Sequence, residues 1–467
     1  MKRRTLGLLA GTGVTALLDS EMRAYAQSAP SDFATLSKTT LTPVGAERAG
    51  NAAGTIPAWT GGMTKLPAGV EWNPATEMTP DFWPDEAPLY EVNASNMAKH
   101  ADNLSLGVQT LIQKQGMSLK VYPTHRTAAC PQWVYDNILA NSQRAQINPA
   151  GGRLGFTGGY GGIPFPVPDT SDPLVAGAQV MWNHNTRWEG SHSRSNQATW
   201  AVSDGQPVLC SGLVTAFYYP YYQQSGDLSS FNGRIYYINN RFFSPSTDAG
   251  SQIIAYYSTN PLQQPDIAWE LLLGQGRVRK APELAYDTPS PYSNGIANFD
   301  EYFGFCGALD EYDWKLIGKQ EILIPYNNNK MRRTSAREAH GPKFLNPDVV
   351  RWELHRVWVV EATLHPGSRN TAVRRRMYVD EDTWTLGVAE SWDGNGNIYK
   401  ANITYNCVFP NLPGTVMLNY ACFNLQTGDY VTMAGQWGDA PYNQSWNHNP
   451  QDPTLFDPQA MAAAASY

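Results

Sequence analysis

Four side chains carry groups that can move a proton near neutral pH: His184, His355, Glu353 and Asp380. A histidine beside a carboxylate can act as an acid–base pair, but nothing in the sequence shows that these four residues converge. The chain has no Gly-x-Ser-x-Gly elbow, no His-Glu-x-x-His motif and no clustered histidines. An enzyme acting on a hydrophobic or aromatic compound therefore stays an alternative without an assigned catalytic residue. We expect neither a cofactor nor a metal ion.

Arg356 lies in the most informative segment, which runs from Arg351 to Glu361. In strand geometry the even positions share one face, which carries Trp352, Leu354, Trp358 and Val360 beside this arginine. An unpaired charge on an apolar face is costly, so the guanidinium needs a partner. Two interpretations are open: an internal ion pair, with Asp380 or Asp382 as a partner, or an anchor for the polar head of a ligand. One β-bulge would reverse the face on which it lies.

Aromatic side chains are more numerous than one ordinary core requires. The chain has 15 Trp, 25 Tyr and 15 Phe, while only 16% of its residues are charged. The excess must line a binding space or pack a large sheet. The aromatic residues that we expect to contact a ligand are Trp182, Trp188, Tyr218, Tyr236, Trp269, Trp352 and Trp358.

Charge is distributed in a way that excludes one class of partner. The chain carries 34 basic and 41 acidic residues, a net charge of −7, so its bulk charge does not favour nucleic acid. Two short basic runs, 277–280 and 374–376, stand out on predicted strands. They can be solvated faces paired with nearby acids such as Glu283 and Asp287, or a docking surface for an acidic partner.

Five cysteines occur, an odd number, and none forms a Cys-x-x-Cys pair. A zinc ribbon or a thioredoxin-like redox site is therefore not expected. Cys407 and Cys422 flank the turn at 411–414 and could face each other across a hairpin as a disulfide. Two buried free thiols are the alternative.

The first 26 residues are typical of a signal peptide. Basic Lys2, Arg3 and Arg4 precede an apolar stretch, and small residues at Ala24 and Ala26 form a cleavage site. Arg3 and Arg4 leave the Sec and twin-arginine routes both open. No later segment has the roughly 20 apolar residues of a membrane helix. The sequence therefore predicts a periplasmic protein, soluble after cleavage near Ala26.

Periodicity predicts a mainly β fold with a few helices. Residues 27–89 form an extended N-terminal segment rich in Pro, Gly, Thr and Ala. Helices are expected near 95–115, capped by Ser95, and near 131–147. Strand signals bounded by turn formers then recur from about 179 to 423 without βαβ alternation, which favours one curved antiparallel sheet. We expect a single domain over 90–436 and a C-terminal tail over 437–467.

The hairpin 269–280 resembles a hairpin of bacterial outer-membrane lipoprotein-sorting proteins, relatives of LolA and LolB. Longer signatures resemble a proteobacterial periplasmic domain-of-unknown-function family of that superfamily. These signatures are Pro164-Phe165-Pro166, Trp182-Asn183-His184 with Arg187, Tyr286-Asp287-Thr288-Pro289, Tyr312-Asp313-Trp314-Lys315, Ile324-Pro325-Tyr326-Asn327, the stretch 353–361, and Tyr378-Val379-Asp380-Glu381-Asp382. Their polar residues, which we expect to be structural or motif positions, are Arg187, Arg277, Arg279, Asp287, Glu353, His355, Arg356, Asp380 and Asp382.

The resemblance implies an incomplete barrel whose concave face is covered by helices that enclose an apolar cavity. It also implies work beside RND or MMPL-type exporters of the inner membrane. The expected function is a periplasmic carrier or adaptor for a lipid, an acyl chain or another hydrophobic compound. A continuous apolar cavity between sheet and helices is the observation that would favour this function most.

Overall fold

The computed structural model describes residues 36, 38–148, 153–272, 277–281 and 286–464. The predicted signal peptide, residues 1–26, lies outside these residues. Within the described ranges, no helix is both long enough and apolar enough to cross a membrane.

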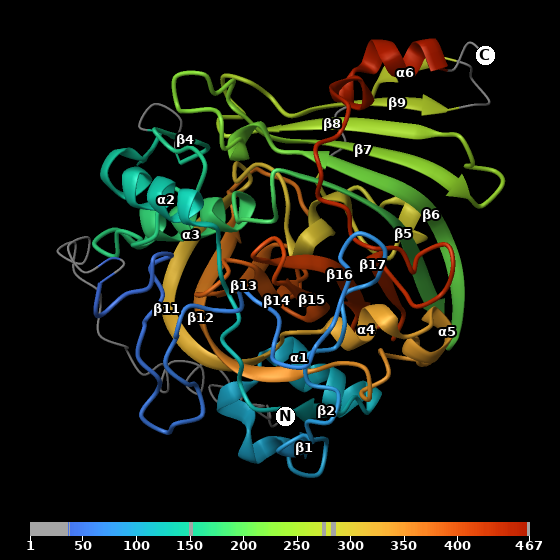
Figure 1. Cartoon of the computed structure of the whole chain (residues 1–467). Helices are drawn as coiled ribbons and strands as arrows, with labels where there is room; N and C mark the ends of the chain where they lie inside the picture. The colour runs from blue at the N-terminus through green and yellow to red at the C-terminus, as the bar shows by residue number, and fades with distance from the viewer. Residues whose placement is uncertain (1–35, 37, 149–152, 273–276, 282–285, 465–467) are drawn as a thin grey trace, which may run out of the picture.

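One large sheet of 15 strands organises the fold (Figure 1). Its order is β1-β2-β12-β13-β14-β15-β16-β17-β5-β6-β7-β8-β9-β10, with β11 paired to β12. Neighbours are antiparallel except where β2 meets β12 in parallel at one position. Among the described residues β10 and β11 form no pairing with each other, so the sheet curves without closing into a barrel. The predicted curved antiparallel sheet is confirmed.

The strands of this sheet are β1 Tyr90–Val92, β2 Leu119–Val121, β5 His192–Ser203, β6 Gln206–Tyr218, β7 Arg234–Ser244, β8 Gln252–Ser258, β9 Ile267–Leu272, β10 Arg277–Lys280, β11 Tyr312–Pro325, β12 Trp352–Leu364, β13 Arg374–Asp380, β14 Leu386–Trp392, β15 Ile398–Phe409, β16 Gly414–Asn424 and β17 Tyr430–Gly435. A separate hairpin joins β3 Gln146–Ile147 to β4 Phe156–Thr157. The late strand β17 pairs with the early strand β5. This pairing joins the two halves of the sheet.

Helices cover both faces of the sheet. The α-helices are α1 Leu106–Thr110, α2 Gln132–Arg144, α3 Pro173–Asn185, α4 Asn329–Arg333, α5 Ala336–Ala339 and α6 Pro458–Ala464. Single 3-10 or π-helical turns are η2 Met97–Lys99, η3 Ala101–Asn103, η4 Leu111–Gln115, η5 Pro220–Tyr222, η7 Pro291–Ser293, η8 Phe299–Gly304 and η9 Pro453–Phe456. Inside the curve, α3 packs against β11 and β12, and η8 packs against β14, β15 and β16.

Alternating side chains divide the core between the two faces. On β12, Val357 and Val359 join the cluster under α1, η4, α4 and α5, whereas Trp358 and Val360 join the cluster around α3. This period of two is what a strand buried on both sides requires. The two largest hydrophobic cores therefore lie on opposite faces of the sheet, and both contain large aromatic residues.

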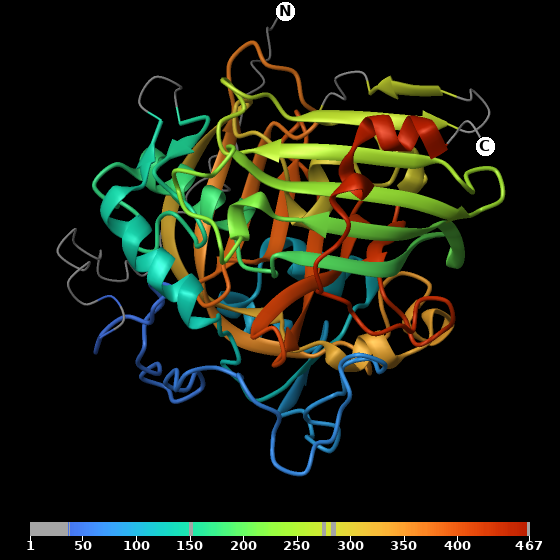
Figure 2. The ribbon, with the colours of Figure 1, turned by 45° about the horizontal axis from the view of Figure 1, so that its top comes forward.

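The last described residues lie across the outer face of β7 and β8, as Figure 2 shows. Asn239 and Tyr256 donate hydrogen bonds to the carbonyls of Leu455 and Phe456. The Phe456 ring packs on Tyr218 and Tyr237 of the same face. This C-terminal segment therefore shields an outer row of tyrosines from solvent.

Three details differ from the sequence-based expectations. The sequence predicts that the strands begin at about 179, but residues 173–185 form α3, which Asp172 caps and Pro173 begins. The segment near 95–115 is broken into η2, η3, α1 and η4, and it is Ser105, not Ser95, that caps α1 by accepting from Val108 N. Cys407 and Cys422 form no disulfide; all five cysteines are free. The register is the reason, because Cys407 faces Val416 and Cys422 faces Asn402.

Candidate ligand-binding pocket

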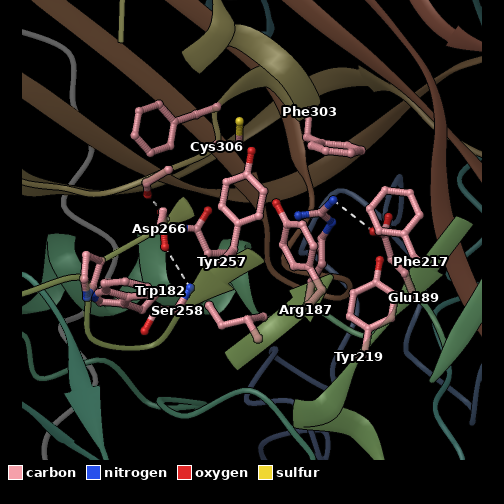
Figure 3. Close-up of a pocket in the computed structure, with 16 residues that line it drawn as sticks. Trp182, Arg187, Glu189, Phe217, Tyr219, Tyr257, Ser258, Asp266, Phe303 and Cys306 are labelled. Atoms are coloured by element: carbon pink, nitrogen blue, oxygen red, sulfur yellow. Dashed lines mark hydrogen bonds and ion pairs between the residues drawn. The ribbon is translucent and has the colours of Figure 1, made fainter. Parts of the chain in front are cut away.

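A pocket lies inside the curve of the sheet, where β6, β7 and β8 face α3 and η8 (Figure 3). We call it the aromatic pocket. Its lining residues are Trp182, Asn185, Arg187, Glu189, Phe217, Tyr219, Ile235, Tyr236, Tyr257, Ser258, Pro261, Asp266, Phe303, Phe305, Cys306 and Gly307. Because α3 also packs on β11 and β12, the pocket lies between strands from the two ends of the sheet.

The aromatic pocket is narrow. About 530 Å³ of space lies between its lining atoms, open solvent included, but only about 30 Å³ is wide enough for the centre of a water molecule. The smaller of these two volumes admits about two water molecules, whereas sites for drug-sized molecules measure several hundred Å³. A larger ligand therefore enters only if lining side chains move.

Rings from three strands and η8 form the walls. Phe217 lies 5.7 Å from both Tyr219 and Tyr236, and 6.2 Å from Phe303, between ring centroids. Tyr236 stacks on its cross-strand partner Tyr257 at 4.6 Å. Strand alternation turns these rings inward while their chain neighbours face out. Such walls suit flat, apolar surfaces.

A charged pair lies at one end of the pocket. Arg187 Nη2 donates to Glu189 Oε2 at 2.9 Å, and Arg187 Nη1 donates to the carbonyl of His184 at 2.8 Å. Glu189 Oε1 accepts from the backbone of Met417. The guanidinium also lies 5.3 Å from the ring centroid of Phe303. The two opposite charges neutralise each other, so this end carries no net charge.

Asp266 lies at the other end of the pocket in Figure 3, beside Ser258 and Trp182. Its Oδ1 accepts from the backbone N–H of Ser258 at 2.8 Å. Burial raises the pKa of Asp266 to about 7, although the Ser258 hydrogen bond and the charge of Arg234 oppose the shift. The carboxyl group therefore changes charge near neutral pH.

Three tyrosine hydroxyls lack protein partners. Within the part of the chain that the structure describes, Tyr219, Tyr236 and Tyr257 make no hydrogen bond through their side chains. Burial raises the pKa of each well above its usual value, so all three stay neutral. None of these hydroxyl oxygens is among the fully buried side-chain atoms that lack a partner, so they are available to water or to a ligand.

A second polar region lies near the start of β12. There the strand is no longer paired with β13, and it contacts β2 and the residues that follow β2. We call it the buried charge network; its members are Glu47, Arg126, Lys319, Glu321, Tyr326, Arg351, Glu353, His355, Arg356, Asp380, Glu381 and Asp382. Arg126 donates to both oxygens of Asp382, at 2.8 and 2.7 Å. Its guanidinium also donates to the carbonyl of Glu47 at 2.8 Å. The N-terminal segment is thereby tied to the sheet.

Arg356 belongs to this network rather than to the aromatic pocket. Its Nη1 donates to Glu381 Oε1 at 3.2 Å and its Nη2 donates to the carbonyl of Ala49 at 3.0 Å. Glu47 and Glu321 lie within 3.8 Å of its Nε. The guanidinium is therefore paired inside the protein, with Glu381 as its partner in place of the expected Asp380 or Asp382.

The two histidines of the enzyme alternative are buried and do not line the aromatic pocket. His184 is fully buried between the carbonyls of Trp384 and Phe305, and burial, followed by the charge of Arg187, lowers its pKa to about 3. His355 is 1% exposed; burial alone would lower its pKa, but the carboxylates of Glu353 and Asp380 raise it. Both rings therefore have structural partners inside the protein.

Among the residues that the structure describes, one group of three side chains has the spacing of a metal site. Ligand atoms of His355, Asp380 and Asp382 lie within 4.8 Å of one another. Both oxygens of Asp382, however, already accept from the Arg126 guanidinium, and His355 Nε2 lies 3.2 Å from Glu353. A cation here would compete with a fixed arginine, so these residues fit an ion-pair network better than a metal centre.

Comparison with known proteins decides the family. Residues 91–462 match the family model described as "Protein of unknown function (DUF1329)". This chain belongs to the DUF1329 family. "Uncharacterized protein PA3922" of Pseudomonas aeruginosa is 32% identical over 406 residues, covering 85% of this chain and 86% of that protein. The family expected from the sequence signatures is confirmed.

Two solved structures are similar to this DUF1329 member over part of its length. A DUF1329 family protein from Desulfovibrio piger is 15% identical, with a TM-score of 0.40, and the match covers 62% of this chain and 99% of that chain. A putative outer membrane lipoprotein-sorting protein domain from Vibrio parahaemolyticus is 12% identical, with a TM-score of 0.40, and the match covers 61% and 97%.

Of the aromatic residues expected at a ligand site, Trp182 and Tyr236 line the pocket, together with the motif residue Arg187. The others lie elsewhere. Trp188 and Trp358 pack in the inner core, Trp352 packs in the outer core, and Tyr218 and Trp269 lie on the outer face beside the C-terminal segment.

Most of the remaining motif residues make structural contacts. Glu353, His355, Asp380 and Asp382 belong to the buried charge network. Arg279 pairs with Glu270 at 2.6 Å, Arg277 is exposed, and Asp287 accepts from Thr371 N. The run 374–376 forms internal ion pairs with Glu361 and Asp300, so its charges are not free for an acidic partner.

Sequence reasoning missed most of the pocket. Phe217 and Tyr219 belong to the run Phe217-Tyr218-Tyr219, in which every residue is aromatic, so alternation cannot say which face is inner. No sequence motif includes Glu189, Asp266 or Phe303. Strand alternation does predict that Phe217 and Tyr219 point to the side opposite to Tyr218, but it does not say which of these sides faces the pocket.

Proposed function

We propose that this DUF1329 protein is a periplasmic carrier or adaptor that binds a lipid, an acyl chain or another hydrophobic compound in the aromatic pocket. One observation carries the proposal: the inner face of a curved sheet, covered by α3 and η8, holds a pocket walled by aromatic side chains. Burying apolar ligand surface there stabilises the complex by roughly 25 cal/mol per Å², before ordering costs.

The cellular setting is part of the proposal. The basic start, apolar stretch and small-residue cleavage site of residues 1–26 support export to the periplasm. A carrier also needs a donor or an acceptor for its cargo. The resemblance of the sequence signatures to the proteobacterial periplasmic family of unknown function supports a role beside an RND or MMPL-type exporter, to which the bound compound would pass.

Protein purified from its native periplasm tests the proposal. Organic extraction and mass spectrometry should recover a lipophilic compound, and a fluorescent lipid should bind saturably to protein stripped of it. Cys306→Trp fills the pocket and should abolish that binding. The control Tyr218→Trp adds bulk on the outer face of β6 and should leave it unchanged. Absence of both a co-purified lipophile and saturable binding would refute the carrier function.

The exporter needs its own test. Photo-cross-linking in living cells, with the probe placed at exposed positions, should capture an inner-membrane transporter. Capture of outer-membrane or soluble proteins in its place would remove the exporter from the proposal while leaving ligand binding intact.

A further inference from the structure

The one cation among the described residues that line the aromatic pocket is already paired within the protein. Arg187 is paired with Glu189 at 2.9 Å, and Glu189 is held by Met417 N as well. Asp266 is the remaining charged group among the lining residues. An incoming carboxylate or phosphate would thus meet two carboxyl groups and one arginine that is already neutralised. Repulsion and loss of hydration would both oppose an anionic head.

The pocket also has neutral hydrogen-bonding groups that have no partner among the described residues. The hydroxyls of Tyr219, Tyr236 and Tyr257 can each donate one hydrogen bond and accept others. Figure 3 shows Tyr257 between the Arg187–Glu189 end and the Asp266 end of the pocket. A hydroxyl or carbonyl group on a ligand would satisfy these tyrosines without bringing a charge into the pocket.

The aromatic walls of the pocket narrow the choice of ligand further. Phe217, Tyr219, Tyr236 and Phe303 present ring faces and edges at centroid distances of 5.7–6.2 Å, and Tyr236 is stacked on Tyr257. Ring systems gain offset-stacked and edge-to-face contacts with such walls beyond simple area burial, and a saturated acyl chain does not.

We infer that the aromatic pocket selects an uncharged, ring-containing amphipathic molecule with hydroxyl or carbonyl groups, and disfavours anionic lipids. This inference rests on the proposed function and deepens it. The tyrosine hydroxyls recognise the ligand's polar groups, the aromatic walls hold its ring system, and Glu189 excludes acids by neutralising Arg187.

Matched small probes test the inference: 2-naphthalenemethanol, 2-naphthoate and decanoate, titrated into the full chain by calorimetry at pH 8. The ring alcohol should bind at least tenfold more tightly than either acid. Tyr257→Phe should weaken binding of the ring alcohol at least fivefold without moving the melting temperature. Its control, Tyr218→Phe on the outer face, should change neither quantity.

Glu189→Gln gives the sharpest test, because glutamine keeps an acceptor for Met417 N but leaves Arg187 with a net charge. The preference for the alcohol over 2-naphthoate should shrink at least fivefold in this variant. Should Glu189→Gln fail to fold, the Tyr257→Phe result carries the test. Equal or tighter binding of the acids by the wild type would overturn the ligand class but not the carrier function. No binding of any probe or of a fluorescent lipid would overturn both.

Discussion

The buried charge network and the aromatic pocket both hold polar groups, but most groups of the network are paired within the protein and several groups of the pocket are not. In the network Glu381 faces three cations, Arg126, Lys319 and Arg356, and carbonyls of the N-terminal segment take up further donors. In the pocket the hydroxyls of Tyr236 and Tyr257 have no partner among the described residues. Pairing inside the protein marks a structural role, and unsatisfied groups facing a space mark a binding role.

The largest expected effect lies in the network. Arg126→Ala should lower the free energy of unfolding by about 3–5 kcal/mol, because it leaves the Asp382 carboxylate buried and unpaired. Both side chains are almost fully buried. Chemical denaturation of wild type and variant measures the loss. The control Arg279→Ala breaks an exposed pair with Glu270 and should cost less than about 1 kcal/mol; equal losses would show that burial of the pair is not what matters.

The next effect concerns how closely α3 approaches the sheet that supports the pocket. A Cβ atom at Gly177 would lie 2.3 Å from the Trp314 carbonyl oxygen. Gly177→Ala should therefore destabilise the fold by about 2 kcal/mol, despite alanine's higher helix propensity. Thermal melts check this. Gly394→Ala, whose Cβ would meet only Val373 at 4.0 Å, should stay within about 0.5 kcal/mol of wild type. A stable Gly177→Ala variant would mean that α3 can move away from β11.

A smaller, pH-dependent effect belongs to the pocket. The pKa of Asp266 is raised to about 7, so the folded protein holds this proton more tightly than the unfolded chain does. Stability should fall as pH rises from about 4 to about 7 and stay low above that. Asp266→Asn removes the penalty while keeping the acceptor for Ser258. The variant should match wild type at pH 4.5 and exceed it by about 1–2 kcal/mol at pH 8.5, since the half-buried carboxyl keeps some solvent contact. Melting curves at both values decide it, and a constant difference between the two proteins would contradict the assignment.

Sequence patterns predicted most of the strands, but not which distant segments meet. The single face predicted for 352–360 was wrong, because Trp352 and Leu354 pack in the outer core whereas Trp358 and Val360 pack in the inner core. The stretch 351–361 correctly marked a strand in which Arg356 needs an internal partner, yet Glu47 and Ala49 lie some 300 positions away along the chain. No local pattern encodes that contact. Bulges also shift faces: one between Arg234 and Tyr236, and another between Tyr405 and Asn406 in the hairpin that carries Cys407 and Cys422.

The most direct test of the account measures stability and binding side by side in Arg356→Ala and Tyr236→Phe. Arg356→Ala should lower the free energy of unfolding by about 1.5–3 kcal/mol, because Glu381 loses one of its three buried cationic partners, while folded protein keeps its affinity for 2-naphthalenemethanol. Tyr236→Phe should leave stability within about 1 kcal/mol and weaken that binding at least fivefold. An Arg356→Ala variant with an unchanged melting midpoint and lost binding would contradict the account and move the ligand site to the buried charge network.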